Sequence, residues 1–344
     1  MQAAPLIELR TDTAEAALSA LQRAYEAAPR EPLVLDLASV RRCERVAGAL
    51  LSNLLVGTLG DATLVLGLPS GEPLDWLTAS GLAFAVANRR GPTKVEGPLA
   101  EDAELWRLPW STSAARYWRQ RHEAPMLFGP SDLSETTVRP DLFGRNYAAF
   151  VDAHLAPVLS RPVHPIADVV WPWLDRLLPR HRDPSRRRAR DGFITEVGRA
   201  VGETVGNVRE HAIYGTKPLH SLVQLAVTRG GRGSNDRLHL VVQDNGPGIA
   251  ATARPKIDRA TAATLLDHQL LFKLFDGSLP PWGRARGQGL PIVRETSLRL
   301  GGTMHAWTKI TRVSASAGTV PLTSGEGLTR FDGTILALSL PMPA

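Results

Sequence analysis

The chain has 344 residues, of which 43% are apolar and 22% are charged, and its net charge is +6 at pH 7. This composition excludes large-scale disorder, and a chain of this length is expected to fold as two domains. No apolar run reaches the roughly 18 to 20 residues that span a bilayer, and the lone cysteine, Cys43, excludes a disulfide framework, so we expect a cytoplasmic protein.

The first hundred residues alternate between strand and helix patterns. Short apolar runs at 33–37 and 62–68 predict buried strands, and residues 44–57 between them predict a helix. We therefore predict a small α/β domain over residues 1–105. Its further helical patterns cover residues 14–27 and 73–87.

The order of these elements resembles STAS domains, the sulfate-transporter and anti-sigma-antagonist modules. In those domains a strand that ends in an Asp leads through a loop into a helix, and here Asp36 ends the strand and the loop runs to Glu44. A Ser or Thr at the helix start often accepts phosphate in that family, and no hydroxyl stands at that place in this chain. The resemblance thus implies a docking module and not a phosphoacceptor.

Residues 106–185 are predicted to form a mostly helical connector. Frequent prolines divide this segment into short pieces, whereas its tryptophans indicate order because disordered linkers are poor in aromatic residues. We expect helices at 145–159 and 166–178. The arginine-rich run at 182–190 predicts a solvated helix start, and a phosphate-binding patch is the alternative.

A long amphipathic helix is predicted over residues 190–214, because apolar residues recur there at helical spacing. Glu203, Asn207 and His211 lie on it at intervals of four, which places the three side chains on one face. An amide oxygen suits Mg²⁺, and a carboxylate one turn away can orient or deprotonate an attacking group. The same three residues could equally be polar groups on a solvated face, so this pattern needs support from elsewhere in the chain.

Two glycine-containing segments supply that support. An alternating strand at 238–242 runs into Asp244, Asn245, Gly246, Pro247, Gly248 and Ile249. A carboxylate at a strand end can accept a hydrogen bond from an amine such as adenine N6, and the glycines allow the backbone to approach closely.

Further along, a helix predicted at 291–300 follows Gly287, Gln288, Gly289 and Leu290. Free N–H groups at such a helix start can hold anionic oxygens.

In this order, the three segments resemble the motifs of the GHKL superfamily, which comprises gyrase B, chaperones, histidine kinases and MutL. Residues 301–308 and 333–341 resemble the last two strands of that fold. The resemblance implies an ATP-binding domain over residues 186–344. Its expected fold is an α/β sandwich of helices on a mixed sheet, distinct from the P-loop fold.

The resemblance also assigns roles to individual residues. Asn207 would coordinate Mg²⁺, Asp244 would bind the adenine amine of ATP, and Thr334 would support the adenine end. Gly246 and Gly248 would shape the base pocket, and Gly287 and Gly289 would contact phosphates. The remaining candidates for nucleotide binding are His211, Ile249, Gln288 and Leu290.

Residues 250–286 correspond to the insert that forms a lid over the nucleotide in this superfamily. An apolar pattern at 260–275 predicts one helix within it. The insert ends in a proline-rich, basic segment, in which Arg284 or Arg286 could reach phosphate or could be solvated.

The spacing of Glu203, Asn207 and His211 most closely resembles the anti-sigma-factor serine kinases, and Glu203 is then the candidate catalytic base. Histidine kinases also need a phosphoacceptor histidine on a helix. The nearest candidates, His122 and His181, lie beside prolines, so we interpret both as surface histidines.

Two functions remain open. One is a kinase-like signalling regulator that uses ATP and Mg²⁺ and acts on a protein docked through the N-terminal domain. The other is a nucleotide-gated conformational ATPase or a noncatalytic ATP sensor, in which lid closure controls dimerisation or partner release. We expect a protein partner, leave a homodimer open, and disfavour nucleic acid, which only the arginine excess suggests.

Overall fold

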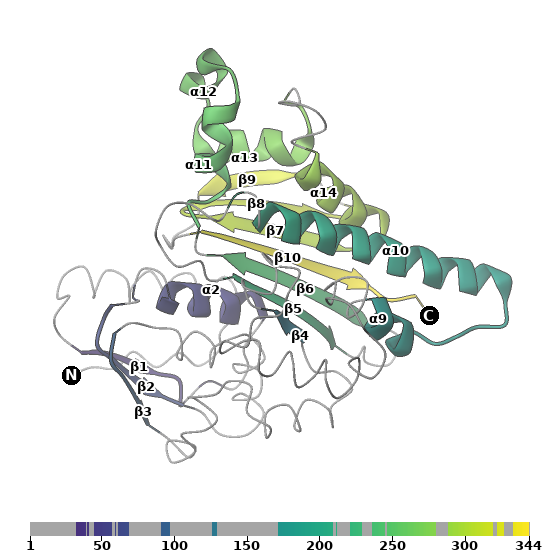
Figure 1. The fold of residues 1–344 in the computed structure, drawn as a ribbon, viewed down its shortest axis with the longest axis horizontal. Coiled ribbons are helices and arrows are strands. Elements are labelled where there is room, and N and C mark those ends of the chain that lie inside the picture. Colours follow the sequence, from purple (N-terminus) through teal and green to yellow (C-terminus); the bar gives the residue numbers. More distant parts are fainter. Residues whose placement is uncertain are drawn as a thin grey trace, which may run out of the picture.

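The computed structural model describes residues 32–38, 40, 45–56, 59, 61–68, 91–96, 126–128, 171–208, 211, 221–228, 236–244, 246–279, 288–318, 322–326 and 333–343. They form a three-stranded sheet of order β1-β2-β3 and a seven-stranded sheet of order β4-β5-β6-β10-β7-β8-β9 (Figure 1). The α/β fold class is confirmed. Within the described ranges, no helix is both long enough and apolar enough to cross a membrane.

The smaller sheet is parallel, and its strands are β1 (Leu33–Asp36), β2 (Leu64–Gly67) and β3 (Thr93–Glu96). Helix α2 (Arg45–Val56) connects β1 to β2 and buries Leu50, Leu51, Leu54 and Leu55. The two strands and the helix expected here are confirmed, whereas β3 was not predicted. The helices expected at 14–27 and 73–87 lie outside the described residues, and the STAS likeness stays a prediction.

The larger sheet is antiparallel at every pairing of its described strands. The expectation of a mixed sheet is therefore corrected: β5 is followed by β6, and β7 by β8 and β9, as neighbours, so each strand reverses direction. The strands are β4 (Met126–Phe128), β5 (Ser221–Thr228), β6 (Arg237–Asp244), β7 (Thr303–Thr308), β8 (Thr311–Ser316), β9 (Thr323–Glu326) and β10 (Thr334–Pro341).

Helices α10 (Pro184–Asn207), α13 (Asp267–Asp276) and α14 (Gly289–Arg299) cover one face of this sheet (Figure 1). Helices α10 and α14 run antiparallel: Glu196 accepts hydrogen bonds from Thr296 (2.9 Å) and Arg299 (2.6 Å) near the end of α14, whereas Gly289 at its start lies beside Glu203 and Asn207. This direction brings the start of α14 to the end of α10. The core between helices and sheet includes Val197, Val201, Leu240, Val242, Phe275, Val293, Leu336 and Leu338.

The opposite face of the sheet is also covered in its centre. Val241, Ile335 and Ala337 alternate with the core residues of β6 and β10, and all three are buried. Helix α2 contacts both of these strands. The N-terminal unit thus packs behind the two strands that carry Asp244 and Thr334.

Helix α10 begins at Pro184, earlier than the predicted residue 190. The Asp183 carboxylate caps it by accepting hydrogen bonds from the main-chain N–H groups of Ser185 (2.7 Å) and Arg186 (3.3 Å), and proline is well suited to the first helical position. The interpretation of the arginine run as a solvated helix start agrees with the structure, since residues 186–188 are exposed. Arg190 is the exception and is buried.

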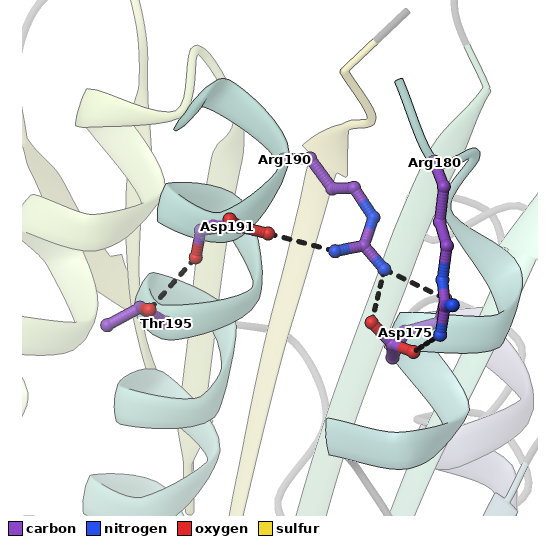
Figure 2. A network of polar contacts seen from close by, with 5 residues as sticks. All are labelled: Asp175, Arg180, Arg190, Asp191 and Thr195. Atoms are coloured by element: carbon purple, nitrogen blue, oxygen red, sulfur yellow. Dashed lines mark hydrogen bonds and ion pairs between the residues drawn. The ribbon is translucent and has the colours of Figure 1, made fainter. Parts of the chain in front are cut away.

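Arg190 fastens α10 to helix α9 (Trp171–Leu177), which lies within the helix expected at 166–178 (Figure 2). Its guanidinium donates to the main-chain oxygen of Asp175 (2.9 Å), to the Asp175 carboxylate and to Asp191 (2.9 Å). Arg180 donates to the same Asp175 carboxylate (2.7 Å), and hydrogen bonds from Arg190 and Arg180 lower the pKa of Asp175 below its usual value. This network holds the first half of α10 in place. The helix expected at 145–159 lies outside the described residues.

Candidate functional site

A pocket lies where the end of α10, the end of β6, the start of β10 and the start of α14 meet. It contains Asn207, His211, Asp244, Gly248, Ile249, Gly289, Leu290 and Thr334, all of them predicted site residues. The sequence did not single out its other lining residues, which are Thr204, Val208, Val242, Thr252, Ala253, Lys256, Leu274 and Leu336. Of the remaining candidates, Glu203 and Gly246 adjoin the pocket, Gln288 is exposed beside Gly289, and Gly287 lies outside the described residues.

The first polar region of the pocket is formed by strand ends and centres on Asp244. The strand register places Asp244 opposite Thr334 of β10. The carboxylate accepts hydrogen bonds from the Gly246 main-chain N–H (2.8 Å) and from both the main chain and the hydroxyl of Thr334. Burial of the carboxylate outweighs the opposing effect of these hydrogen bonds and raises the pKa of Asp244 to about 7. A buried acceptor between apolar side chains can recognise the amine of a flat heterocycle.

The turn after β6 is held against two other strands of the sheet. Gly248 has a φ of +87°, and a Cβ at this residue would lie 2.4 Å from Thr308 Oγ1. That hydroxyl accepts a hydrogen bond from the Ile249 N–H (3.0 Å) and donates one to the Gly333 carbonyl (3.1 Å). Only glycine fits here without strain. Thr308 was not predicted, and its place at the end of a predicted strand was the one available signal.

The second polar region is formed by helix ends. Gly289, the first residue of α14, lies so close to α10 that a Cβ would be 2.9 Å from Glu203 Oε2 and 3.2 Å from Asn207 Nδ2. The absence of a side chain leaves room beside the first N–H groups of α14. Gly289 at the start of α14 therefore lies beside Glu203 and Asn207 at the end of α10.

Asn207 carries an unmet hydrogen-bonding requirement. Its Nδ2 atom is buried and has no partner among the described residues. Leaving such a group unsatisfied costs about 1–3 kcal/mol, which indicates that a ligand or water completes it. Rotation of the amide would present its oxygen instead. The described residues hold no cluster of three His, Cys, Asp or Glu. An amide oxygen can supply one ligand to Mg²⁺, whose shell is otherwise completed by water and phosphate.

His211 and Lys256 complete the pocket. Helix α10 ends at Asn207, Val208 and His211 lie in a wider, π-type turn, and residues 212–214 of the predicted helix lie outside the described residues. The Nδ1 atom of His211 lies 3.1 Å from Nζ of Lys256. Lys256 ends the short helix η3 (Arg254–Lys256) of the insert and was not predicted.

The insert contributes three further helices: α11 (Ile249–Ala253), α12 (Arg259–Thr264) and α13. The single helix expected at 260–275 is corrected to two, because the backbone is extended at Leu265 and Leu266. Arg254 fixes this corner by donating to the carbonyls of Ala262 and Leu265 (3.0 Å) and to Asp267 (2.5 Å). Arg284 and Arg286 lie outside the described residues.

The elements that form the pocket match a known protein family. Residues 193–343 match the family model described as histidine kinase-, DNA gyrase B-, and HSP90-like ATPase. The matched range contains the described parts of the pocket, from α10 to β10. No curated protein matches the chain.

Proposed function

Residues 193–343 belong to the GHKL superfamily of ATP-binding domains, and on that premise we propose that the chain binds ATP with Mg²⁺ and acts as a kinase-like signalling regulator of a protein partner. The observation that carries this proposal is the close approach of Gly289 to Glu203 and Asn207, which leaves no room for a Cβ. It brings a carboxylate, an amide and the N–H groups of a helix start together in one part of the pocket.

The two polar regions suit the two parts of a nucleotide. Adenine fits the region of Asp244 and Thr334, where apolar residues such as Val242, Ile249 and Leu336 can flank the ring. The phosphates fit the region of Asn207 and Gly289, where the start of α14 offers N–H donors. Bound Mg²⁺ would offset the charge of the phosphates.

Glu203 is the proposed catalytic base. Its carboxylate is partly buried, and Oε2 faces the position that a Cβ of Gly289 would occupy. From there it can take a proton from a hydroxyl of a partner protein or orient a water molecule. The first outcome makes the protein a kinase, and the second makes it an ATPase.

A nucleotide-gated conformational ATPase or ATP sensor is the second candidate. It is supported by the insert, because Thr252, Ala253 and Lys256 line the pocket directly. Occupation of the pocket can therefore change the position of the insert and control a partner. We propose that the partner is a protein docked through the N-terminal unit, and a homodimer remains the alternative.

The test measures ATP binding and turnover with Mg²⁺ in the wild type and three variants. Asp244→Asn should lose binding, because an amide N–H would face the adenine amine. Asn207→Ala should lose the Mg²⁺-dependent part of the affinity. Glu203→Ala should retain binding and lose turnover. A wild type that fails to bind ATP would overturn the proposal.

A second measurement separates kinase from ATPase or sensor. Labelled ATP is incubated with the protein and a cytosolic extract, with Glu203→Ala as the matched control. Transfer of label to a protein only with the wild type supports the kinase. Release of free phosphate without transfer supports the ATPase, and binding with neither supports the sensor.

A further inference from the structure

Lys256 and His211 meet at the pocket from two segments that lie 45 positions apart in the sequence. His211 follows α10, Lys256 ends η3, and both residues line the pocket. A lysine ammonium can only donate hydrogen bonds, so Nδ1 of His211 acts as the acceptor in this contact. The pair therefore brings a full positive charge and several donors to the pocket.

The backbone on both sides of Lys256 is fixed. Ala253 is buried, and Ile257 packs against the small core of the insert. Asp258 caps α12 by accepting a hydrogen bond from the Thr261 N–H (2.9 Å). Arg254 closes the same corner through its contacts with residues 262–267. The exposed side chain of Lys256 is thus carried on a rigid corner beside the pocket.

The charges near the pocket leave a role for this lysine. Among the described residues that line it, Lys256 is the only lysine or arginine. The nearby carboxylates are those of Asp244 in the lining and Glu203 beside Gly289. A phosphate chain bound next to Glu203 would meet a like charge. Among the described lining residues, Lys256 carries the ammonium that can offset it.

We propose that Lys256 is a phosphate-binding residue, which keeps His211 as one hydrogen-bond partner and donates to a phosphate oxygen of the bound nucleotide. This proposal rests on the function proposed above. An ammonium has three donors and acts as a compact point charge, so it can serve both partners. The insert would then be tied to α10 through the nucleotide.

The experiment compares dissociation constants for ATP, ADP and adenosine. We expect Lys256→Met to weaken ATP and ADP about tenfold, the usual effect of losing a charged hydrogen bond, and to leave adenosine unchanged. Lys256→Arg should keep most of the affinity. The matched control is Arg259→Met, because Arg259 is exposed on α12, close to Lys256, and does not line the pocket.

The outcomes are distinct. Wild-type affinity for ATP in Lys256→Met would overturn the proposal, and so would an equal loss for adenosine, which would make Lys256 a residue that only shapes the pocket. A tenfold loss in Arg259→Met would reduce the effect to general surface charge and would also overturn it. Failure of the wild type to bind ATP would instead reject the proposed function.

Discussion

The two polar regions of the pocket are built from different kinds of element. Around Asp244 and Thr308, strand ends supply hydrogen-bond partners within the protein, from Gly246, Ile249, Gly333 and Thr334. Around Asn207, helix ends leave a buried amide nitrogen without a partner in the described structure. The polar groups of the first region are hydrogen-bonded within the protein, whereas the second region keeps a buried donor that a ligand or water can satisfy. We infer that base recognition is preformed, whereas the phosphate region is completed by its ligand.

The largest effect is expected at Gly289. Gly289→Ala places a methyl group 2.9 Å from Glu203 Oε2 and 3.2 Å from Asn207 Nδ2, in the space assigned to phosphate. We expect roughly a hundredfold loss of ATP turnover, equal to about 2.7 kcal/mol. The unfolding free energy should change by no more than about 1 kcal/mol, because alanine favours a helix.

The control for this change is Gly192→Ala on α10, where an added Cβ meets no atom within 4 Å. It should leave turnover unchanged and raise stability slightly. Full turnover by Gly289→Ala would show that the space beside Gly289 does not hold phosphate.

The next largest effect is expected on stability, at Gly248 in the turn after β6. Gly248→Ala combines a φ of +87° with a contact of 2.4 Å to Thr308 Oγ1, whereas Gly318→Ala has a φ of +82° and open space. We expect Gly318→Ala to cost about 1 kcal/mol of unfolding free energy and Gly248→Ala about 3 kcal/mol. Chemical denaturation measures both, and equal costs would show that the Thr308 contact is unimportant.

A third prediction uses the pKa of Asp244, which burial raises from 3.8 to about 7. The carboxylate form accepts from the adenine amine, so adenosine should bind roughly tenfold more tightly at pH 8 than at pH 6. Calorimetry with adenosine avoids the titration of phosphate groups. Affinity that is constant over this range would show that ionisation of Asp244 does not control base binding.

The same shift has the opposite effect on stability. The folded chain keeps a proton that the unfolded chain releases above pH 3.8, so the contribution of Asp244 is full below that pH and is lost as pH rises through about 7. Asp244→Asn should therefore gain stability relative to the wild type between pH 4 and pH 7. A constant difference between the two proteins would contradict the raised pKa.

The smallest effect should appear at Asn207. Because its Nδ2 is buried without a partner, Asn207→Leu should leave the unfolding free energy within about 1 kcal/mol of the wild type while ATP affinity falls. Thr308→Val is the counterpart, since it removes a hydroxyl that makes two hydrogen bonds. That change should cost about 1–3 kcal/mol. Thermal unfolding of both variants without nucleotide distinguishes the two regions.

Sequence predicted the parts of this site that are coded locally. Glu203, Asn207 and His211 follow helical spacing, and Asp244 and Gly289 mark the ends of recognisable elements. Thr308 and Lys256 were missed because their partners, Ile249 and His211, lie 59 and 45 positions away. Such contacts arise from the sheet register and from the path of the insert, which no periodicity encodes.

The secondary structure was predicted in part, as the site was. Apolar periodicity located α10, and the glycine-rich segment before Pro291 located α14. Periodicity merged α12 and α13, because Leu265 and Leu266 continue the apolar pattern while their backbone is extended. Strands β4, β5, β8 and β9 were not predicted, and β4 lies within the segment 106–185 that was expected to be a mostly helical connector. The second half of the chain was recognised from its motifs, and the order of its strands emerged only from their pairing.

Strand β4 has a practical consequence for work on the isolated ATP-binding region. Residues 126–128 pair with residues 223–225 of β5, so a chain cut at residue 186 would present β5 as a bare outer strand. Unpaired strand edges invite intermolecular association. The same cut would remove α2 and uncover Val241, Ile335 and Ala337. Fragments intended for crystallisation or binding assays should therefore keep both β4 and α2 and begin ahead of residue 45, and shorter ones should aggregate.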